Sequence, residues 1–228
     1  MKNYPETATE RFDNANFHIR YCLSFIKKYI KGDILEIGAG CGSFTRNYIK
    51  TDFKNITLTE LDKKNIQDLN RKFKNFKNVK VLNTTINKIE NEYDSILYLH
   101  VLEHIKDDQD EIREATKRLK KGGHLLIMVP AHQKIYSNLD RAVGHYRRYE
   151  REFFKEELTN LKRVRIFSLD IIGYLLYFLN KIFFKEEIFP SSLKIFIWDK
   201  ICTPLTAIID RLTNYNYGKC IIAIYKKN

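Results

Sequence analysis

Between residues 33 and 129, short and almost uninterrupted apolar runs alternate with longer polar stretches, and this alternation limits the possible folds more than any other feature of the chain. Short strands that are apolar on both faces are typical of a parallel sheet covered by helices on each side. Strands that alternate with helices predict a doubly wound α/β sheet. The five runs are DILEIG (33–38), ITLTEL (56–61), VKVL (79–82), DSILYL (94–99) and HLLIMV (124–129).

Two other stretches carry clear helix signals. Residues 19–30 place apolar side chains at three- and four-residue spacing, which predicts a helix with one apolar face. Residues 107–121 begin with acidic side chains and end with basic ones, as the helix dipole favours. Because the pair Gly122-Gly123 follows, we expect this helix to end there with a left-handed glycine cap.

The later part of the chain departs from the alternation. Residues 163–169 and 219–225 are two further apolar runs, which complete a seven-stranded, mostly parallel sheet. Between them, residues 170–218 predict a late apolar helical insertion, with further helices separated around Pro190 and Pro204. Its first apolar run, IIGYLLYFLNKIFF, is too short to span a bilayer. Four roles are open for this insertion. It extends the core, or it covers the active site, rests on a membrane or buries a dimer contact.

The bulk properties predict a single domain over residues 1–228, with its core at about 19–170. The net charge of +12 favours nucleic acid, acidic lipid headgroups or phosphorylated metabolites as partners. Lysine is spread along the whole chain, however, so the charge equally indicates the general amino-acid composition of the source organism's proteins. The four cysteines stand far apart without a CxxC pair, so no metal site is expected and a reducing compartment is favoured. Since residues 1–17 lack an apolar signal core, we expect a cytoplasmic protein, with peripheral contact at the inner membrane face as an option.

The first strand runs directly into a glycine turn, in the stretch DILEIGAGCGSFT. In an open α/β sheet, ligands bind at the carboxyl ends of the strands, where Gly38, Gly40 and Gly42 lie. Dinucleotide-binding turns have the spacing G-x-G-x-x-G and aim a helix N-terminus at pyrophosphate. Here the spacing is G-x-G-x-G, and the carboxylate of Glu36 would repel phosphate. The turn therefore predicts a ligand that carries positive charge.

A second acid stands at the tip of the next strand, in Thr59-Glu60-Leu61-Asp62. At this position Glu60 can accept both hydroxyls of a ribose, as its counterpart does in nucleotide-binding folds. Asp62 is the alternative ribose ligand, and it can also cap the helix that follows. A ribose joined to a cationic tail without phosphates describes S-adenosylmethionine, which is the cofactor that we expect.

Four segments together resemble the class I S-adenosylmethionine-dependent methyltransferases. They are EIGAGCG (36–42), the acid Glu60, LYLHVLEHI (97–105) and LKKGGHLLIMVP (119–130). The segment VPAHQKIYSNLDRAVGHYRRY (129–149) and the tail from Tyr217 are similar to a bacterial and archaeal branch found with glycosyltransferases and polyprenyl-linked sugar pathways.

The resemblance implies a Rossmann-like methyltransferase fold and assigns a cofactor role to seven residues. Glu36 and the three glycines would shape the methionine pocket, Glu60 would hold the ribose, Leu61 would lie against the adenine, and His100 would line the methyl-donor side. The family usually has an acid after the third strand for the adenine amine, where this chain has Asn83-Thr84-Thr85. We expect Thr85 or a backbone carbonyl to take that place.

The loop after the fifth strand, residues 130–149, is dense in polar side chains and should lie at the acceptor side. An acceptor hydroxyl must lose a proton, and histidine can accept it near neutral pH. His145 is the first candidate base and His132 the second, with Asp140 orienting a histidine or accepting directly. We expect Tyr136, Arg147, Arg148 and Tyr149 to bind the acceptor, with the arginines holding a phosphate or carboxylate. Alternatively, this is a solvated loop whose arginines pair with Glu150 and Glu152. In the loop after the fourth strand, we expect His104 to pack or to order the loop, with a catalytic role as the alternative.

Together these features predict methyl transfer to a small or amphipathic anionic acceptor, such as a sugar, a phosphorylated metabolite or a lipid-linked glycan. An RNA or DNA methyltransferase would explain the charge, but the fourth strand ends in Leu-His-Val-Leu instead of the N/D-P-P-Y/F typical of base-amine methylation. A non-catalytic methyltransferase-like binding subunit is a second alternative. A nicotinamide oxidoreductase is the weakest, because the glycine spacing is wrong. The acceptor atom and the oligomeric state stay open.

Overall fold

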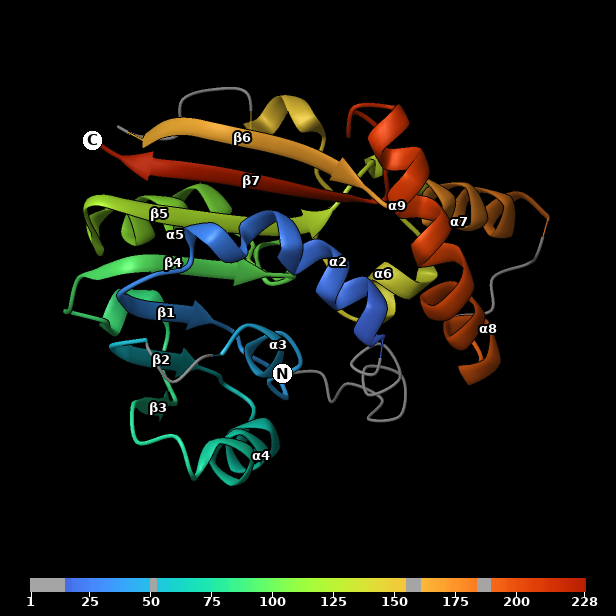
Figure 1. Cartoon of the computed structure of the whole chain (residues 1–228). Coiled ribbons are helices and arrows are strands. Elements are labelled where there is room, and N and C mark those ends of the chain that lie inside the picture. Colours follow the sequence, from blue (N-terminus) through green and yellow to red (C-terminus); the bar gives the residue numbers. More distant parts are fainter. Residues whose placement is uncertain (1–14, 50–52, 155–160, 184–189) are drawn as a thin grey trace.

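The computed structural model describes residues 15–49, 53–154, 161–183 and 190–228 and contains the predicted α/β sheet (Figure 1). Seven strands are formed by the described residues, in the order β3-β2-β1-β4-β5-β7-β6. The first five of these are parallel, and β7 runs antiparallel to both of its neighbours. Their bounds are β1 (Asp33–Ile37), β2 (Asn55–Thr59), β3 (Val79–Leu82), β4 (Tyr93–Leu99), β5 (Leu119–Pro130), β6 (Leu161–Leu169) and β7 (Cys220–Lys227).

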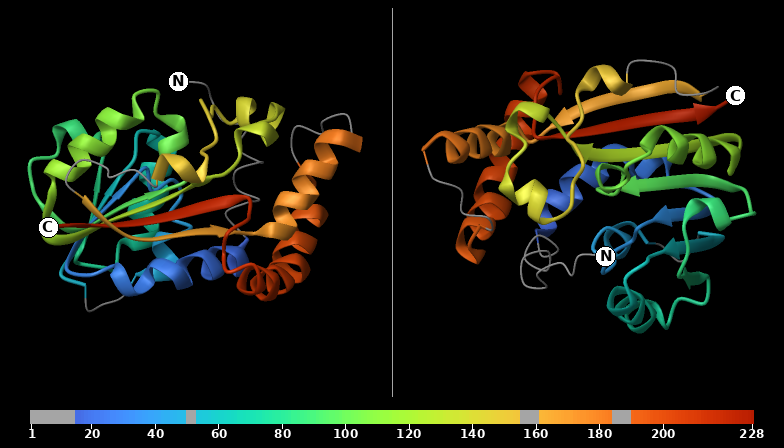
Figure 2. Two further views of the ribbon diagram at one scale, coloured as in Figure 1. Left: turned by 90° about the horizontal axis from the view of Figure 1, so that it is seen from above. Right: turned by 180° about the vertical axis from the view of Figure 1, so that it is seen from behind.

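Helices cover both faces of the sheet, as Figure 2 shows from above. Successive strand residues point to opposite faces, so Ile34 packs with α2, α3 and α4, and Leu35 packs with α5. Both residues are fully buried. The helix bounds are α2 (Asn16–Ile26), α3 (Thr45–Tyr48), α4 (Lys63–Phe73), α5 (Asp108–Lys117), α6 (Asn138–Ala142), α7 (Ile171–Phe183), α8 (Ser192–Ile197) and α9 (Thr203–Leu212).

Two predicted helix ends were wrong. The first helix already ends at Ile26 and is followed by a 3₁₀ turn. The charged helix α5 ends at Lys117, because Leu119 already begins β5 and is fully buried opposite Tyr93. Gly122, at φ +75°, lies within β5, beside the irregularity in its pairing with β4. The glycine pair therefore belongs to strand β5 and does not cap helix α5.

The predicted helical insertion consists of α7, α8 and α9, which stand beyond the carboxyl ends of the parallel strands (Figure 1). The expected break at Pro204 was wrong, because a π-helical turn, Trp198–Cys202, joins α8 directly to α9. Pro204 sits in the first turn of α9, where a π turn accommodates the missing N–H. No described helix is long and apolar enough to cross a membrane.

Buried carboxylates fasten this insertion to the sheet. Asp170, at φ +70°, accepts hydrogen bonds from Trp198 Nε1 and Lys219 Nζ, both at 3.1 Å. Asp210 on α9 accepts from the Asp170 backbone N–H at 2.7 Å and from the Tyr21 hydroxyl at 2.8 Å. Because these contacts link the insertion to α2 and to the start of β7, the insertion has a fixed position over the strand ends.

Candidate functional site

The glycine turn after β1 has three left-handed glycines with different surroundings. Gly38, Gly40 and Gly42 have φ values of +62°, +56° and +81°, a region that strongly favours glycine. A Cβ on Gly38 would meet the Val101 side chain at 2.8 Å, and one on Gly42 would meet the Phe73 ring at 2.8 Å. A Cβ on Gly40 would meet no described atom within 4 Å. Gly40 is thus the glycine that opens onto space for a ligand.

Glu36 lies beneath this turn and is 2% exposed. Its Oε2 accepts hydrogen bonds from Thr45 Oγ1 at 2.7 Å and from the Tyr48 hydroxyl at 2.5 Å. Burial raises the pKa of the Glu36 carboxyl to about 7, although both hydrogen bonds act to lower it. The carboxyl group therefore ties the end of β1 to α3 and supports the turn from within. Its predicted contact with the methionine part of the cofactor stays a prediction.

Glu60 lies on the open side of the turn. Its Oε2 accepts the Gly40 N–H at 2.8 Å, and its Oε1 accepts the N–H groups of Leu61 and Asp62 at 2.7 and 2.9 Å. Asp62 instead caps α4 by accepting the Asn65 N–H at 2.9 Å. Of the two acids considered for the ribose, Glu60 is therefore the one that faces the glycine turn.

The loop after β3 contributes Asn83, to which the sequence pattern had assigned no role. Asn83 Nδ2 donates to the backbone carbonyls of Glu60 and Leu61 at 3.0 and 3.3 Å. Its place directly after β3 was the signal that could have identified it. Thr85 is exposed just before a 3₁₀ turn, and its predicted contact with adenine stays a prediction.

The residues at these strand ends fit S-adenosylmethionine. Gly40 leaves room for the ligand, Glu60 offers carboxylate oxygens for ribose hydroxyls, and the exposed Leu61 offers an apolar surface to a base. At the end of β4, His100 adopts φ +59° and its side chain is about one-third exposed. Its Nδ1 lies 3.3 Å from Glu103 Oε1, in the turn that follows β4.

On the acceptor side, His145 is held by a buried carboxylate. Its Nδ1 lies 2.8 Å from Asp140 Oδ1, which also accepts from Arg148 Nε at 2.9 Å. Burial would raise the pKa of Asp140, but the His145 hydrogen bond and the Arg148 charge outweigh it and lower the pKa to about 2. An ionised Asp140 therefore orients His145, and the catalytic role expected for the two residues stays a prediction.

The four predicted acceptor-binding residues have partners inside the protein. Arg147 Nη1 lies 2.8 Å from Asp108 Oδ2, and the Tyr149 hydroxyl donates to the same oxygen at 2.8 Å. Arg148 is 6% exposed and stacks on the Tyr177 ring at 4.5 Å. The arginines thus pair with Asp108 and Asp140 and not, as the alternative had it, with Glu150 and Glu152.

Burial separates these four residues into two groups. Arg148 and Tyr149 are buried and position the loop, which differs from the predicted contact with the acceptor. Tyr136 donates to the His145 carbonyl at 2.7 Å, and about one-third of the Arg147 side chain is exposed. For Tyr136 and Arg147, contact with the acceptor stays a prediction.

The other two histidines of this region differ in position. His132, at φ +65°, has Nδ1 3.3 Å from Glu150 Oε2, and its ring packs against Tyr174 of α7. The ring of His104 packs edge-on against His145 with centroids 4.7 Å apart. Glu103 precedes His104 and is fully buried. Its carboxylate and the imidazoles of His104 and His145 therefore lie close together after the end of β4. His104 therefore belongs to the polar cluster as well as to the loop packing.

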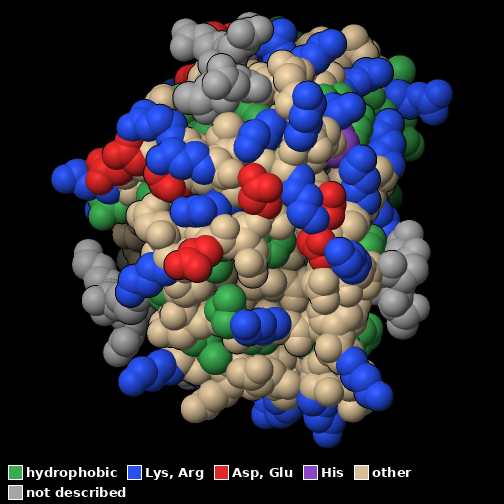
Figure 3. Space-filling model, turned by 90° about the vertical axis from the view of Figure 1, so that its left-hand side faces the viewer, with side chains coloured by type: hydrophobic (Ala, Val, Ile, Leu, Met, Phe, Trp, Pro, Cys, Tyr) green, Lys and Arg blue, Asp and Glu red, His purple; other side chains and the backbone are tan. Residues whose placement is uncertain are grey.

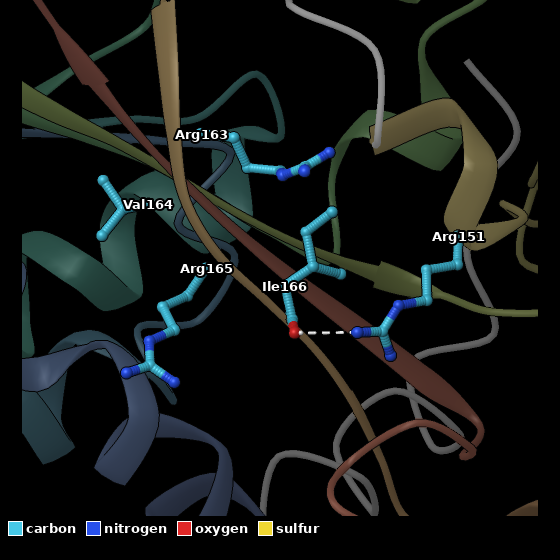
Figure 4. A pocket seen from close by; sticks show the side chains of 5 residues that line it. All are labelled: Arg151, Arg163, Val164, Arg165 and Ile166. Atoms are coloured by element: carbon cyan, nitrogen blue, oxygen red, sulfur yellow. Dashed lines mark hydrogen bonds between the residues drawn. The ribbon is translucent and has the colours of Figure 1, made fainter.

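A cavity of about 460 Å³ lies elsewhere, on the edge strand β6 (Figure 4). Within it, Arg151 donates to the Ile166 carbonyl at 3.2 Å. It is lined by Arg151, Arg163, Val164, Arg165 and Ile166. Because β5 and β7 separate β6 from β4 in the sheet, this cavity is not part of the site at the strand ends.

Comparison with known proteins agrees with this geometry. A family model described as a methyltransferase domain matches residues 14–163. The ubiquinone biosynthesis O-methyltransferase of Rickettsia bellii is 30% identical over 117 residues, which cover 48% of each chain. A hybrid PKS-NRPS synthetase of Talaromyces variabilis is 27% identical over 136 residues, covering 55% of this chain and 3% of that one. The chain thus spans about half or less of the length of these curated relatives.

Solved structures share the fold at low sequence identity. Coclaurine N-methyltransferase, bound to N-methylheliamine and S-adenosylhomocysteine, has a TM-score of 0.62 at 17% identity, covering 93% of this chain and 72% of that one. The N-methyltransferase NodS of Bradyrhizobium japonicum, in complex with S-adenosylhomocysteine, has a TM-score of 0.57 at 18% identity, covering 99% and 89%. The fold is therefore the Rossmann-like methyltransferase fold. This chain belongs to the methyltransferase domain family.

Proposed function

We propose that this protein transfers a methyl group from S-adenosylmethionine to a small or amphipathic, anionic acceptor. The observation that carries the proposal is the placement of two complementary half-sites at neighbouring strand ends. Gly40 and Glu60 form the cofactor side, and the His145–Asp140 pair forms the acceptor side. His100 and Glu103, 3.3 Å apart at the end of β4, connect the two. When bound, the cofactor supplies an electrophilic methyl group on a sulfonium.

The protein's own contribution is to align the acceptor and to take up its proton. Alignment of nucleophile, methyl group and sulfur supplies much of the rate enhancement in such a displacement. For a hydroxyl acceptor, the histidine cluster beside Glu103 removes the proton, and Asp140 keeps His145 in one orientation. Arg147, which is paired with Asp108 but keeps about one-third of its side chain exposed, is the cation that would bind a phosphate or carboxylate of the acceptor.

The acceptor class follows from the resemblance and from the insertion. The branch found with glycosyltransferases and polyprenyl-linked sugars suggests a sugar, a phosphorylated metabolite or a lipid-linked glycan. The relatives are named as O- and N-methyltransferases, so they do not decide the acceptor atom. The test is release of S-adenosylhomocysteine in the presence of sugar phosphates, lipid-linked sugars or tRNA. We expect turnover with one of the first two, and turnover with none of them would contradict the proposal.

A lipid-linked acceptor is supported by an exposed apolar stripe on α8, the π turn and α9. Its side chains recur every three or four residues, so they share one side of this continuous helix. These residues are 41–80% exposed, which is unusual for six large apolar residues on one side of a helix. The stripe consists of Leu193, Ile197, Ile201, Leu205, Ile208 and Leu212.

We propose that this apolar stripe rests on an anionic membrane surface. Lys194, Lys200 and Arg211 lie on the same helices, and the whole chain carries a charge of +12. Apolar and cationic side chains on one surface helix are the combination that binds at the headgroup boundary. Because the insertion stands over the strand ends, binding there would bring the site close to a lipid-anchored acceptor.

The test is co-sedimentation with phosphatidylglycerol or phosphatidylcholine vesicles. We expect the protein to bind the first kind, and a Leu205→Glu/Ile208→Glu variant to bind at least about tenfold more weakly. Val164→Glu, at an exposed apolar residue on β6, is the matched control. A dimer that the double variant converts to monomers, without vesicle binding, would show instead that the stripe is a subunit contact.

Nucleic acid is less favoured as the acceptor, because the positive charge is dispersed. Figure 3 shows the end of the molecule opposite the carboxyl ends of the parallel strands, where lysine and arginine side chains are spread widely among few acidic ones. A basic surface far from the site does not help a substrate to reach it. Salt-sensitive turnover of tRNA or duplex DNA would reverse this preference.

A further inference from the structure

Three potential metal ligands from two separate segments meet at the end of β4. Glu103 and His104 belong to a 3₁₀ turn, Leu102–His104, and His145 follows α6, about 40 residues later. Each offers one oxygen or nitrogen atom, and these atoms lie within 4.8 Å of one another. His145 Nε2 is 3.9 Å from Glu103 Oε1, which is too long for a hydrogen bond. The three side chains are therefore close to one another, but Glu103 and His145 are not hydrogen bonded.

One carboxylate oxygen of Glu103 has no hydrogen-bond partner among the described residues. The residue is 0% exposed, and its Oε2 accepts no hydrogen bond from any described group. A buried carboxylate with an unpartnered oxygen is costly, and a bound cation would offset that cost.

His145 is oriented as metal-binding histidines are. In such sites, the ring nitrogen that does not bind the metal usually donates to a carboxylate or a carbonyl, which fixes the ring and its tautomer. His145 donates from Nδ1 to Asp140 Oδ1 at 2.8 Å, so Nε2 is directed at the cluster. Asp140 is itself fixed by Arg148 and by the Ser137 backbone N–H, at 2.9 Å each.

We propose that Glu103, His104 and His145 bind a divalent transition-metal ion. Two imidazoles and one carboxylate suit Zn²⁺, Mn²⁺ or Fe²⁺ better than Mg²⁺ or Ca²⁺. Ligands about 2.0–2.2 Å from an ion lie about 3–3.5 Å from one another, so closure needs movements of about 1 Å. The cysteine pattern had led to an expectation of no metal, but this ligand set contains no cysteine.

The consequence for catalysis rests on the proposed function. His100 connects Glu103 to the cofactor side, so the ion would lie between the cofactor and the acceptor. An acceptor hydroxyl bound to such an ion is more acidic and can release its proton to water near neutral pH. His145 would then act as a ligand of the ion and not as a free base. Asp140 is a positioning residue in this arrangement.

The test is equilibrium dialysis of the full-length protein against Zn²⁺ and, separately, Mn²⁺, with the bound metal counted per chain. We expect one ion per chain, and none at the same concentration for Glu103→Gln or His145→Asn. Asp140→Asn should weaken binding about 10- to 100-fold, because it loosens the orientation of His145. His124→Gln removes an imidazole from β5, away from the cluster, and should bind as the parent does.

Binding of S-adenosylhomocysteine, measured on the same samples, separates this inference from the proposed function and confirms that each variant is folded. A protein that binds S-adenosylhomocysteine but neither metal overturns the metal site and leaves the proposed function standing. A protein that binds metal but not S-adenosylhomocysteine overturns the proposed function alone. Equal metal binding by the parent and both ligand variants would also refute the site.

Discussion

Replacing Glu36 by glutamine tests how the glycine turn is supported. The Glu36 carboxyl is buried, and its Oε2 accepts from Thr45 and Tyr48. Glutamine keeps an oxygen that can accept both hydrogen bonds, but it cannot ionise. Because burial raises the pKa of Glu36 from 4.5 to about 7, the folded protein holds this proton more tightly than the unfolded chain does.

The sign of the pH effect follows from that difference. Between pH 4.5 and about 7 the folded state binds more protons at this group than the unfolded state, so the free energy of unfolding falls as pH rises. At 1.36 kcal/mol for each pH unit of pKa displacement, the loss is at most about 3 kcal/mol and is complete above about pH 7. Glu36→Gln lacks this loss. Relative to the parent, it should gain about 3 kcal/mol of stability between pH 4.5 and pH 8.

Urea unfolding at pH 4.5 and pH 8, without ligand, measures the difference between the two proteins. Contributions from other titrating groups cancel in the comparison, since both proteins share them. Glu90→Gln removes a carboxylate from an exposed position and should show the pH dependence of the parent. If Glu36→Gln and the parent lose stability in parallel from pH 4.5 to pH 8, Glu36 is not held in the buried environment described.

Three further substitutions follow from the geometry. Glu60→Gln should weaken S-adenosylmethionine binding about 10- to 100-fold in calorimetry, because a carboxylate that accepts ribose hydroxyls is lost; unchanged affinity would exclude it as the ribose ligand. Gly40→Ala should fold with a loss of about 1 kcal/mol for its φ of +56° and should bind the cofactor poorly; full binding would show that Gly40 does not face the ligand. Asp170→Asn should destabilise by about 3 kcal/mol in urea unfolding, because Lys219 loses its buried partner, and a change below about 1 kcal/mol would contradict that role.

The strand pattern of the sheet could be predicted from the sequence, because a strand that is buried on both faces must be apolar throughout. Helix ends were less predictable. The charge pattern of residues 107–121 is that of a helix reaching the glycine pair, yet Leu119 is buried and already paired in β5. Pro204 suggested a break between two helices. The π turn before it lets the helix continue from α8 into α9 without that break.

The proximity of Gly40 and Glu60 could be predicted because both follow their strands directly, and strand ends meet at one edge of a parallel sheet. Glu60 and Gly40, 20 residues apart, are in hydrogen-bond contact for this reason. The cluster of Glu103, His104 and His145 could not be predicted in the same way. It depends on how the loop around α6 folds back onto β4, and that return is set by buried pairs such as Asp140 with Arg148.

The central claim is that the strand ends bind S-adenosylmethionine through the glycine turn and Glu60. Calorimetric titration of the protein with S-adenosylhomocysteine, and separately with NAD⁺, tests this claim most directly. The account predicts one S-adenosylhomocysteine bound per chain, clearly weaker binding by Glu60→Gln, and no heat from NAD⁺. Binding of NAD⁺, or equal S-adenosylhomocysteine binding by the parent and Glu60→Gln, would contradict it.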